Sequence, residues 1–316
     1  MAWTAADIPD QSGRVALVTG ANGGLGLETA RELARKGTHV VIAARNQDKA
    51  ETTRRRLVTE IPSASLEVRR LDLASLESIH ELAANVLAEH VAIDLLVNNA
   101  GVMATSRGET ADGYELQFGT NHLGHFALTA LLMPALLRGS NARVVTVTST
   151  GRHFGGPVDA NDPHLQSDYD PWRAYGRSKK ANLQFAVELN RRLEVAGASV
   201  ASLVAHPGFS NTDLQAQSVR ASEGGGSQRF FHAMVGRFGM TAYDGALPQL
   251  RAATDPTARG GELYAPRWVN FGPPVRRPIS ERARKSGALR SLWAISERET
   301  RVGLDIEALA QQARKG

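Results

Sequence analysis

Six short apolar runs, rich in β-branched residues, alternate along the chain with longer segments of helical periodicity. The runs lie at 14–19, 39–43, 66–71, 93–97, 143–148 and 199–205. Runs of this kind are apolar on both faces, which is typical of strands in a parallel sheet that helices cover on each side. Because crossovers between parallel strands are right-handed, helices wind onto both faces of such a sheet. The sequence therefore predicts an α/β fold with a doubly wound parallel sheet.

The composition limits the class of protein further. A length of 316 residues allows two domains or one large α/β domain. No internal repeat or low-complexity linker divides the chain, so we predict one domain over residues 1–316, with a looser part from Asn211 onward. The absence of cysteine excludes disulfides, a cysteine nucleophile and Cys-ligated metal sites. A net charge of +5 over this length is mild and does not predict nucleic-acid binding.

The sequence predicts neither a secretory signal nor a membrane span. The N-terminal segment carries Asp7 and Asp10 and has no apolar run. The most apolar stretch, residues 128–137, contains Pro134 and is much shorter than the ~20 residues that a bilayer span needs. A cytoplasmic protein is the resulting expectation.

A glycine-rich turn, Thr19-Gly20-Ala21-Asn22-Gly23-Gly24-Leu25-Gly26, follows the first apolar run. Gly20 allows a sharp turn, Gly24 allows the backbone to approach a pyrophosphate, and Gly26 allows close packing of helix on strand. The N–H groups that begin the next helix would face the anion. A simple tight βα turn is the alternative, but the position after the first strand of a βαβ unit favours nucleotide binding.

Tyr175 and Lys179 lie four residues apart in a segment of helical periodicity, 172–195, and would therefore project from one face of a helix. Free tyrosine has a pKa near ~10, and a neighbouring ammonium should lower it toward the range that general acid–base catalysis requires. Taken alone, the pair would also fit an ordinary surface helix. Its place after a candidate nucleotide loop favours catalysis.

The Gly-x-x-x-Gly-x-Gly spacing, Asn98-Asn99-Ala100-Gly101 and the Tyr-x-x-x-Lys pair together resemble the short-chain dehydrogenase/reductase superfamily. The resemblance covers residues 13–300 and implies a single-domain Rossmann fold that uses a nicotinamide cofactor. It implies a catalytic set of Asn121, Ser149, Tyr175 and Lys179, in which Ser149 holds the substrate oxygen and Asn121 holds a proton-relay water. Without the resemblance, Ser149 would pass as an ordinary serine at a strand end.

The resemblance also implies the cofactor contacts. They come from Gly20, Asn22, Gly24, Leu25, Gly26, Arg45, Asp72, Leu73, Asn99, Ala100, Gly101, Tyr175, Lys179, Pro207, Gly208 and Thr212. Asp72 would contact the adenine, although it would also serve as a helix N-cap. Pro207 and Gly208 would lie behind the nicotinamide, although they would also form a plain turn.

The end of the second strand bears on the choice of dinucleotide. It reads Ala43-Ala44-Arg45-Asn46 and has no carboxylate for a ribose 2′-hydroxyl. Arg45 could bind a 2′-phosphate instead, so we expect a preference for NADP(H), with NAD(H) and a simple solvated arginine as the alternatives.

The branch within the superfamily follows from an insertion. Ser149 and Tyr175 are 26 residues apart, and residues 152–173 between them are rich in Gly, Pro and Asp. This spacing, Asn22, Arg45 and the run at 292–297 resemble the retinol dehydrogenase and protochlorophyllide reductase branch. That branch implies hydride transfer to or from a carbonyl or alcohol of a small-molecule substrate. A C=C reductase and a non-catalytic NADP(H)-binding sensor remain as alternatives.

Residues 211–240 combine three glycines with an apolar segment and would form a lid over a bulky apolar substrate, or else a loop with a short packing helix. An extension at 274–316 begins with a basic run, interpreted as a solvated face. His122 and His125 lack a third ligand and are expected in the core, so no metal site is predicted. The sequence leaves monomer and homo-oligomer open.

Overall fold

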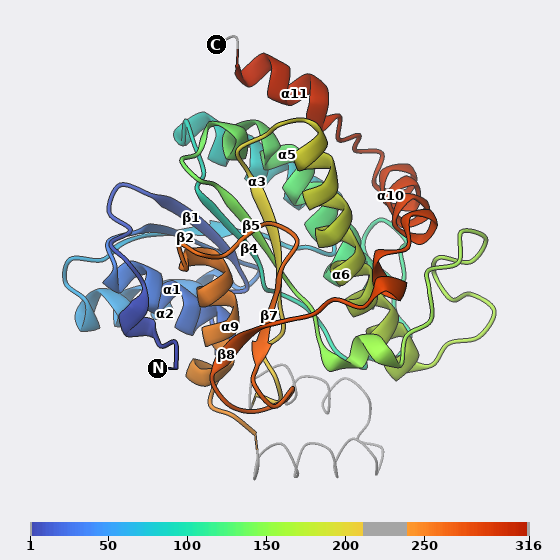
Figure 1. Cartoon of the computed structure of the whole chain (residues 1–316), viewed down its shortest axis with the longest axis horizontal. Helices are drawn as coiled ribbons and strands as arrows, with labels where there is room; N and C mark the ends of the chain where they lie inside the picture. The colour runs from blue at the N-terminus through green and yellow to red at the C-terminus, as the bar shows by residue number, and fades with distance from the viewer. Residues whose placement is uncertain (1, 211–238, 315–316) are drawn as a thin grey trace.

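A mixed eight-stranded sheet runs through the centre of the computed structural model, which describes residues 2–210 and 239–314. The strands follow the order β3-β2-β1-β4-β5-β6-β7-β8 (Figure 1). They are β1 Val15–Thr19, β2 His39–Ala44, β3 Ser65–Arg70, β4 Leu95–Asn98, β5 Arg143–Val147, β6 Ala201–Ala205, β7 Leu263–Pro266 and β8 Pro274–Arg277. The first six correspond to the six predicted apolar runs. The order reverses between β1 and β4, where an open parallel sheet places its ligand crevice.

Helices cover both faces of the sheet, as the prediction of a doubly wound fold requires (Figure 1). One face carries α1 Gly24–Arg35, α2 Gln47–Glu60 and α9 Ala242–Thr254, whose apolar residues join a core with Val18 and Val40. The opposite face carries α3 Leu76–Glu89, α5 Gly124–Arg138 and α6 Pro171–Val195, packed on Leu17, Val41 and Val144. The α/β fold with a single sheet is therefore confirmed.

One strand departs from the prediction of a parallel sheet. β8 pairs with β7 in the antiparallel direction, and Ala265 lies opposite Val275. A short turn of residues 267–273 joins the two strands, and a connection of this length reverses the chain but cannot cross over to a parallel partner. The other strand pairs are parallel.

The C-terminal residues contribute to the core. Two helices, α10 Ser286–Thr300 and α11 Ile306–Ala313, follow the short turn η4 Glu281–Arg284. Trp293 of α10 is 3% exposed and lies within 5.3 Å of Phe126 of α5, centroid to centroid. The prediction of a solvated face concerned only the basic run that begins the extension, and Arg276 and Arg290 of that run are exposed.

Shorter elements join the main ones. They are η1 Ala5–Asp7, α4 Leu116–Phe118, the π-helical turn η2 Gly119–Leu123 and η3 Thr150–His153.

The predicted lid at 211–240 falls almost entirely on residues 211–238, outside the described residues. Within the described ranges, no helix combines the length and the apolar character needed to cross a bilayer.

Candidate active site

The glycine-rich turn between β1 and α1 is tightly packed. Gly20 has φ of +69°, a conformation that glycine adopts without strain. A Cβ atom on Gly26 would lie 2.5 Å from the carbonyl oxygen of Gly20 and 2.6 Å from Asn99 Nδ2, closer than real Cβ atoms approach. The turn leads into α1, whose first backbone N–H groups have no acceptor inside the helix and favour an anion.

Asn99 and Thr19 hold this turn from behind. The Asn99 Nδ2 amide donates to the carbonyl oxygen of Thr19 at 2.8 Å, and the hydroxyl oxygen of Thr19 accepts from the backbone N–H of Asn99 and of Ala100 at 3.0 Å each. The Asn-Asn-Ala-Gly segment after β4 is thereby fixed against the end of β1. The motif therefore also has a structural role, which is to hold the segment after β4 against the end of β1, and the sequence pattern alone does not reveal this role.

The three hydroxyl residues after β5 have different surroundings. The Thr148 hydroxyl donates to the carbonyl oxygen of Lys179 at 2.6 Å and thus ties β5 to α6. The Ser149 hydroxyl oxygen accepts from the backbone N–H of Gly151 at 3.1 Å and is hydrogen-bonded with the phenol of Tyr175. Ser149, and not its neighbour Thr148, therefore faces Tyr175.

Tyr175 and Lys179 project from one side of α6, as their spacing predicts. Tyr175 is 6% exposed and Lys179 is 4% exposed. The Lys179 ammonium donates to the carbonyl oxygen of Val147 at 3.3 Å. Burial lowers the pKa of Lys179 to about 8, so most of these side chains are still charged at neutral pH.

The predicted lowering of the Tyr175 pKa is wrong for this structure. Burial raises the pKa of the Tyr175 phenol, and the hydrogen bond with Ser149 offsets only part of that increase. The sequence reasoning counted the charge of Lys179 but could not count the desolvation of a phenol that is only 6% exposed. At neutral pH the phenol is therefore protonated.

Asn121 lies in the π-helical turn η2, and its side-chain amide is engaged by protein groups. Its Oδ1 accepts from the backbone N–H of Val102 at 2.7 Å, and its Nδ2 donates to the Val102 carbonyl at 2.9 Å and to Ser178 Oγ at 2.9 Å. A Cβ atom on Gly101 would lie 2.8 Å from Asn121 Oδ1 and 3.3 Å from Lys179 Nζ. Asn121 thus lies behind Gly101.

The glycine turn and the buried tyrosine border one cavity of about 680 Å³. This volume lies in the range of sites that hold small ligands and cofactors. The cavity brings together most of the residues that the sequence analysis selected. These are Gly20, Asn22, Gly24, Leu25, Asn99, Ala100, Gly101, Ser149, Tyr175, Lys179, Pro207 and Gly208.

Five of the predicted site residues that the structure describes do not line this cavity. Gly26 and Asn121 lie behind its wall, and Arg45 is exposed one residue after β2. Asp72 accepts from the backbone N–H of Ala74 at 3.0 Å, whereas Ser75 is the N-cap of α3. Leu73 is buried against Gly124. Thr212 lies outside the described residues.

The cavity also has lining residues that the sequence analysis missed. Lys49 borders it from the first turn of α2, and no motif signals this because the contact depends on how α2 packs. Four apolar residues also line the cavity: Met103, Phe154, Trp172 and Phe209. The Trp172 ring stands edge-on to the Tyr175 ring, with their centroids 6.4 Å apart. Single aromatic residues in loops carry no sequence signature of a site.

The residues present fit a nicotinamide dinucleotide. At Gly26 the backbone of the turn leaves no room for a side chain, and the helix N-terminus beside it suits a pyrophosphate. The buried phenol and ammonium lie on the same cavity.

Comparisons with known proteins agree with this arrangement. Residues 14–223 match the short chain dehydrogenase family. The chain is 37% identical to human retinol dehydrogenase 12 over 284 residues, which cover 90% of this chain and 85% of that protein. Human retinol dehydrogenase 13 is 42% identical over 64% of this chain and 60% of its own length. Mouse polyprenol dehydrogenase is 44% identical over 66% of this chain and 63% of its own length. The matches to these last two relatives therefore span less than two thirds of their length.

Solved structures show the same fold. An uncharacterized protein from Mycobacterium paratuberculosis superposes with a TM-score of 0.80 and 39% identity, covering 97% of this chain and 100% of that chain. A protein described as an NAD(P)-dependent gluconate 5-dehydrogenase from Beutenbergia cavernae, solved with bound NADP, gives a TM-score of 0.60 at 27% identity, over 80% of this chain and 95% of that chain. The chain belongs to the short-chain dehydrogenase/reductase family of oxidoreductases, in its retinol dehydrogenase-like branch.

Proposed function

We propose that this protein is an NADP(H)-dependent oxidoreductase that transfers hydride between the nicotinamide and a carbonyl or alcohol of a bulky apolar substrate. The observation that carries the proposal is the convergence of Ser149, Tyr175 and Lys179 on the cavity that the glycine turn also borders. A protein that only sensed the cofactor would have no use for a buried acid–base pair.

Each polar residue has a proposed part in the reaction. When bound, the nicotinamide supplies or accepts the hydride. Ser149 hydrogen-bonds the substrate oxygen and keeps it beside the phenol of Tyr175. Tyr175, which is protonated at neutral pH, donates its proton to that oxygen when a carbonyl is reduced. Lys179 supplies a buried positive charge and binds the ribose. Asn121 is proposed to hold the proton-relay water that leads to Lys179, while its side-chain amide is bonded to Val102 and Ser178.

The character of the cavity wall supports an apolar substrate. Met103, Phe154, Trp172 and Phe209 line it. Phe154 is 77% exposed, so a substrate that covers this ring removes a large apolar surface from water. Two relatives are named for retinol and polyprenol, both long apolar alcohols. A long isoprenoid or a similar hydrocarbon chain next to the reacting oxygen fits these observations.

The preference for NADP(H) is proposed to rest on Arg45 and Lys49. Arg45 is the exposed residue just after β2, and Lys49 borders the cavity one helical turn later. We expect Arg45→Ala to raise the Kd for NADPH by about tenfold, because one charge-assisted hydrogen bond to the 2′-phosphate is lost. The Kd for NADH should change by less than about twofold, and fluorescence titration measures both constants.

Arg56→Ala is the matched control for Arg45. Arg56 is also exposed and, like Arg45, does not line the cavity, but it lies in α2 seven residues beyond Lys49 and away from the end of β2. Loss of the Arg56 side chain should leave the ratio of the Kd for NADPH to the Kd for NADH unchanged. If the Arg45 variant weakened NADH as much as NADPH, or if the native protein bound NADH more tightly, the proposed basis for selectivity would be wrong.

A substrate panel tests the function itself. Aldehydes, ketones and α,β-unsaturated carbonyl compounds, each with a short and a long hydrocarbon chain, are incubated with NADPH, and the nicotinamide absorbance is followed. We expect kcat/KM to increase with chain length by at least about tenfold, since each buried methylene contributes about 0.8 kcal/mol. Saturation of the C=C bond with the carbonyl left intact would favour the double-bond reductase instead.

A further inference from the structure

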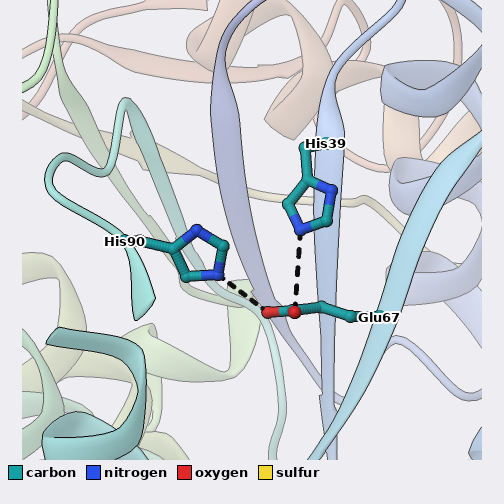
Figure 2. Close-up of side chains that lie close together, drawn as sticks. All are labelled: His39, Glu67 and His90. Carbon is teal, nitrogen blue, oxygen red and sulfur yellow. Dashed lines mark hydrogen bonds and ion pairs between the residues drawn. The ribbon is translucent and has the colours of Figure 1, made fainter. Parts of the chain in front are cut away.

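Two histidines and a glutamate from three separate elements meet at one end of the sheet (Figure 2). His39 begins β2, Glu67 lies within β3, and His90 is the residue that ends α3. His90 Nε2 is 3.0 Å from Glu67 Oε1, and His39 Nε2 is 3.8 Å from Glu67 Oε2. The potential ligand atoms of all three residues lie within 4.8 Å of one another.

The fold explains why these side chains meet. Glu67 pairs with Val41 in the β2–β3 register, and His39 lies two residues before Val41. The side chains of His39, Val41 and Glu67 therefore project from the same face of the sheet. Val41 packs in the core with Leu82 and Val86 of α3, which places the end of that helix over this face. No spacing motif exists in the sequence, which is why the sequence analysis did not predict a metal site.

His39 is oriented as a ligand. Its Nδ1 is hydrogen-bonded with Ser65 Oγ at 2.7 Å, which fixes the ring so that Nε2 faces Glu67. His39 Nε2 is buried and has no hydrogen-bond partner within the described part of the chain. A hydrogen bond on one ring nitrogen that fixes the ring and leaves the other nitrogen for the metal is the usual arrangement of a metal-binding histidine.

The distances suit a tetrahedral ion. With metal–ligand bonds of about 2.1 Å, neighbouring ligand atoms in a tetrahedral zinc site lie about 3.4 Å apart. His90 Nε2 and His39 Nε2 lie 3.0 Å and 3.8 Å from different oxygens of Glu67, and one ligand atom from each of the three residues lies within 4.8 Å of the other two, so the side chains must rotate toward a common point to form the site.

The charge around the cluster favours a cation. Arg69 Nη2 is 3.1 Å from Glu67 Oε2 and also forms an ion pair with Glu89. With neutral histidines, the carboxylates of Glu67 and Glu89 and the guanidinium of Arg69 give the cluster a net charge of −1. Arg69 keeps its ion pair with Glu89 if Glu67 turns toward a metal ion.

We propose that His39, Glu67 and His90 bind a divalent transition-metal ion of the zinc class, with a water molecule as the fourth ligand. Imidazole and carboxylate ligands suit Zn²⁺ and not Mg²⁺, which prefers an all-oxygen shell. β3 is the edge strand of the sheet, so the ion would fasten this edge to the end of α3. His39 lies at the opposite end of β2 from the cofactor side, roughly 17 Å along the strand, so the ion's role would be structural.

Metal titration of the full chain tests the proposal. Tag-free protein treated with a chelator is titrated with ZnCl₂ and separately with MgCl₂ in a calorimeter at about pH 7.5. We expect one Zn²⁺ per chain with a micromolar or lower Kd, no heat from Mg²⁺, and a visible Co²⁺ spectrum of the tetrahedral type. Zinc should also raise the thermal midpoint, because the ion binds only the folded chain.

Variants of the three residues decide whether this cluster is the site. Glu67→Gln and His90→Gln should each raise the Kd for Zn²⁺ at least tenfold. His80→Gln, an exposed histidine in α3, should leave it unchanged. NADPH binding by every variant checks the fold. A missing one-to-one zinc isotherm, or a His90→Gln variant that retains the native Kd, would overturn the proposal and leave an ordinary histidine–carboxylate network.

Discussion

Replacement of Tyr175 by phenylalanine is expected to lower kcat for carbonyl reduction by about 10³-fold, within the range attributed to a positioned general acid. The phenol is the proton donor in the proposed reaction, and burial keeps it protonated at neutral pH. Phenylalanine retains the ring that packs against Met103 and Trp172, so the cavity should keep its shape. The Kd for NADPH should therefore stay within about threefold of the native value.

Steady-state kinetics and fluorescence titration measure the two effects separately. Tyr169→Phe is the matched control, because Tyr169 is half-buried and its hydroxyl donates to the Thr105 carbonyl at 2.9 Å without lining the cavity. That variant should retain kcat within about threefold. A Tyr175→Phe enzyme that still turned over at the native rate would show that another group provides the proton.

Acidification is expected to destabilise the fold steeply below about pH 6.5. Burial lowers the pKa of His122 to about 3, of His125 to about 4 and of His206 to about 3, from an ordinary value of 6.5. Between these values and pH 6.5 the unfolded chain binds three protons that the folded chain does not, so the free energy of unfolding decreases as the pH falls. Each histidine contributes about 1.4 kcal/mol per pH unit, or about 4 kcal/mol together.

Urea unfolding at several pH values between about 4.5 and 7.5 measures this dependence. His122→Gln should reduce the slope by about one third, even though losing the ring stacked on Phe118, 5.2 Å away, lowers stability at every pH. Native and His122→Gln proteins with equal slopes would contradict the assignment.

The sheet was predictable because its signals are local. A buried parallel strand must be apolar on both faces, and the glycine turn must leave room for the backbone at Gly20 and Gly26. β7 and β8 escaped notice because they are only four residues long and include Pro266 and Pro274. The burial of Trp293 of α10 was not predicted because it depends on packing against Phe126 of α5 and Phe185 of α6.

The candidate site was predictable only in part, for a related reason. The motifs locate Ser149, Tyr175 and Lys179, but the desolvation that raises the Tyr175 pKa depends on everything that encloses the ring. Lys49 joins the cavity through the packing of α2, and His39, Glu67 and His90 meet only once β2, β3 and α3 are assembled. Properties that arise from such non-local contacts carry no sequence motif.

The most direct test of the central claim is to follow the transferred hydride. NADPH carrying deuterium at C4 of the nicotinamide is incubated with the native enzyme and a long-chain α,β-unsaturated aldehyde, and the product is analysed by mass spectrometry and NMR. The account predicts an alcohol with one deuterium on the former carbonyl carbon, formed at a rate that Tyr175→Phe abolishes. Deuterium on a carbon of the former double bond, or no transfer to any member of the substrate panel, would contradict it.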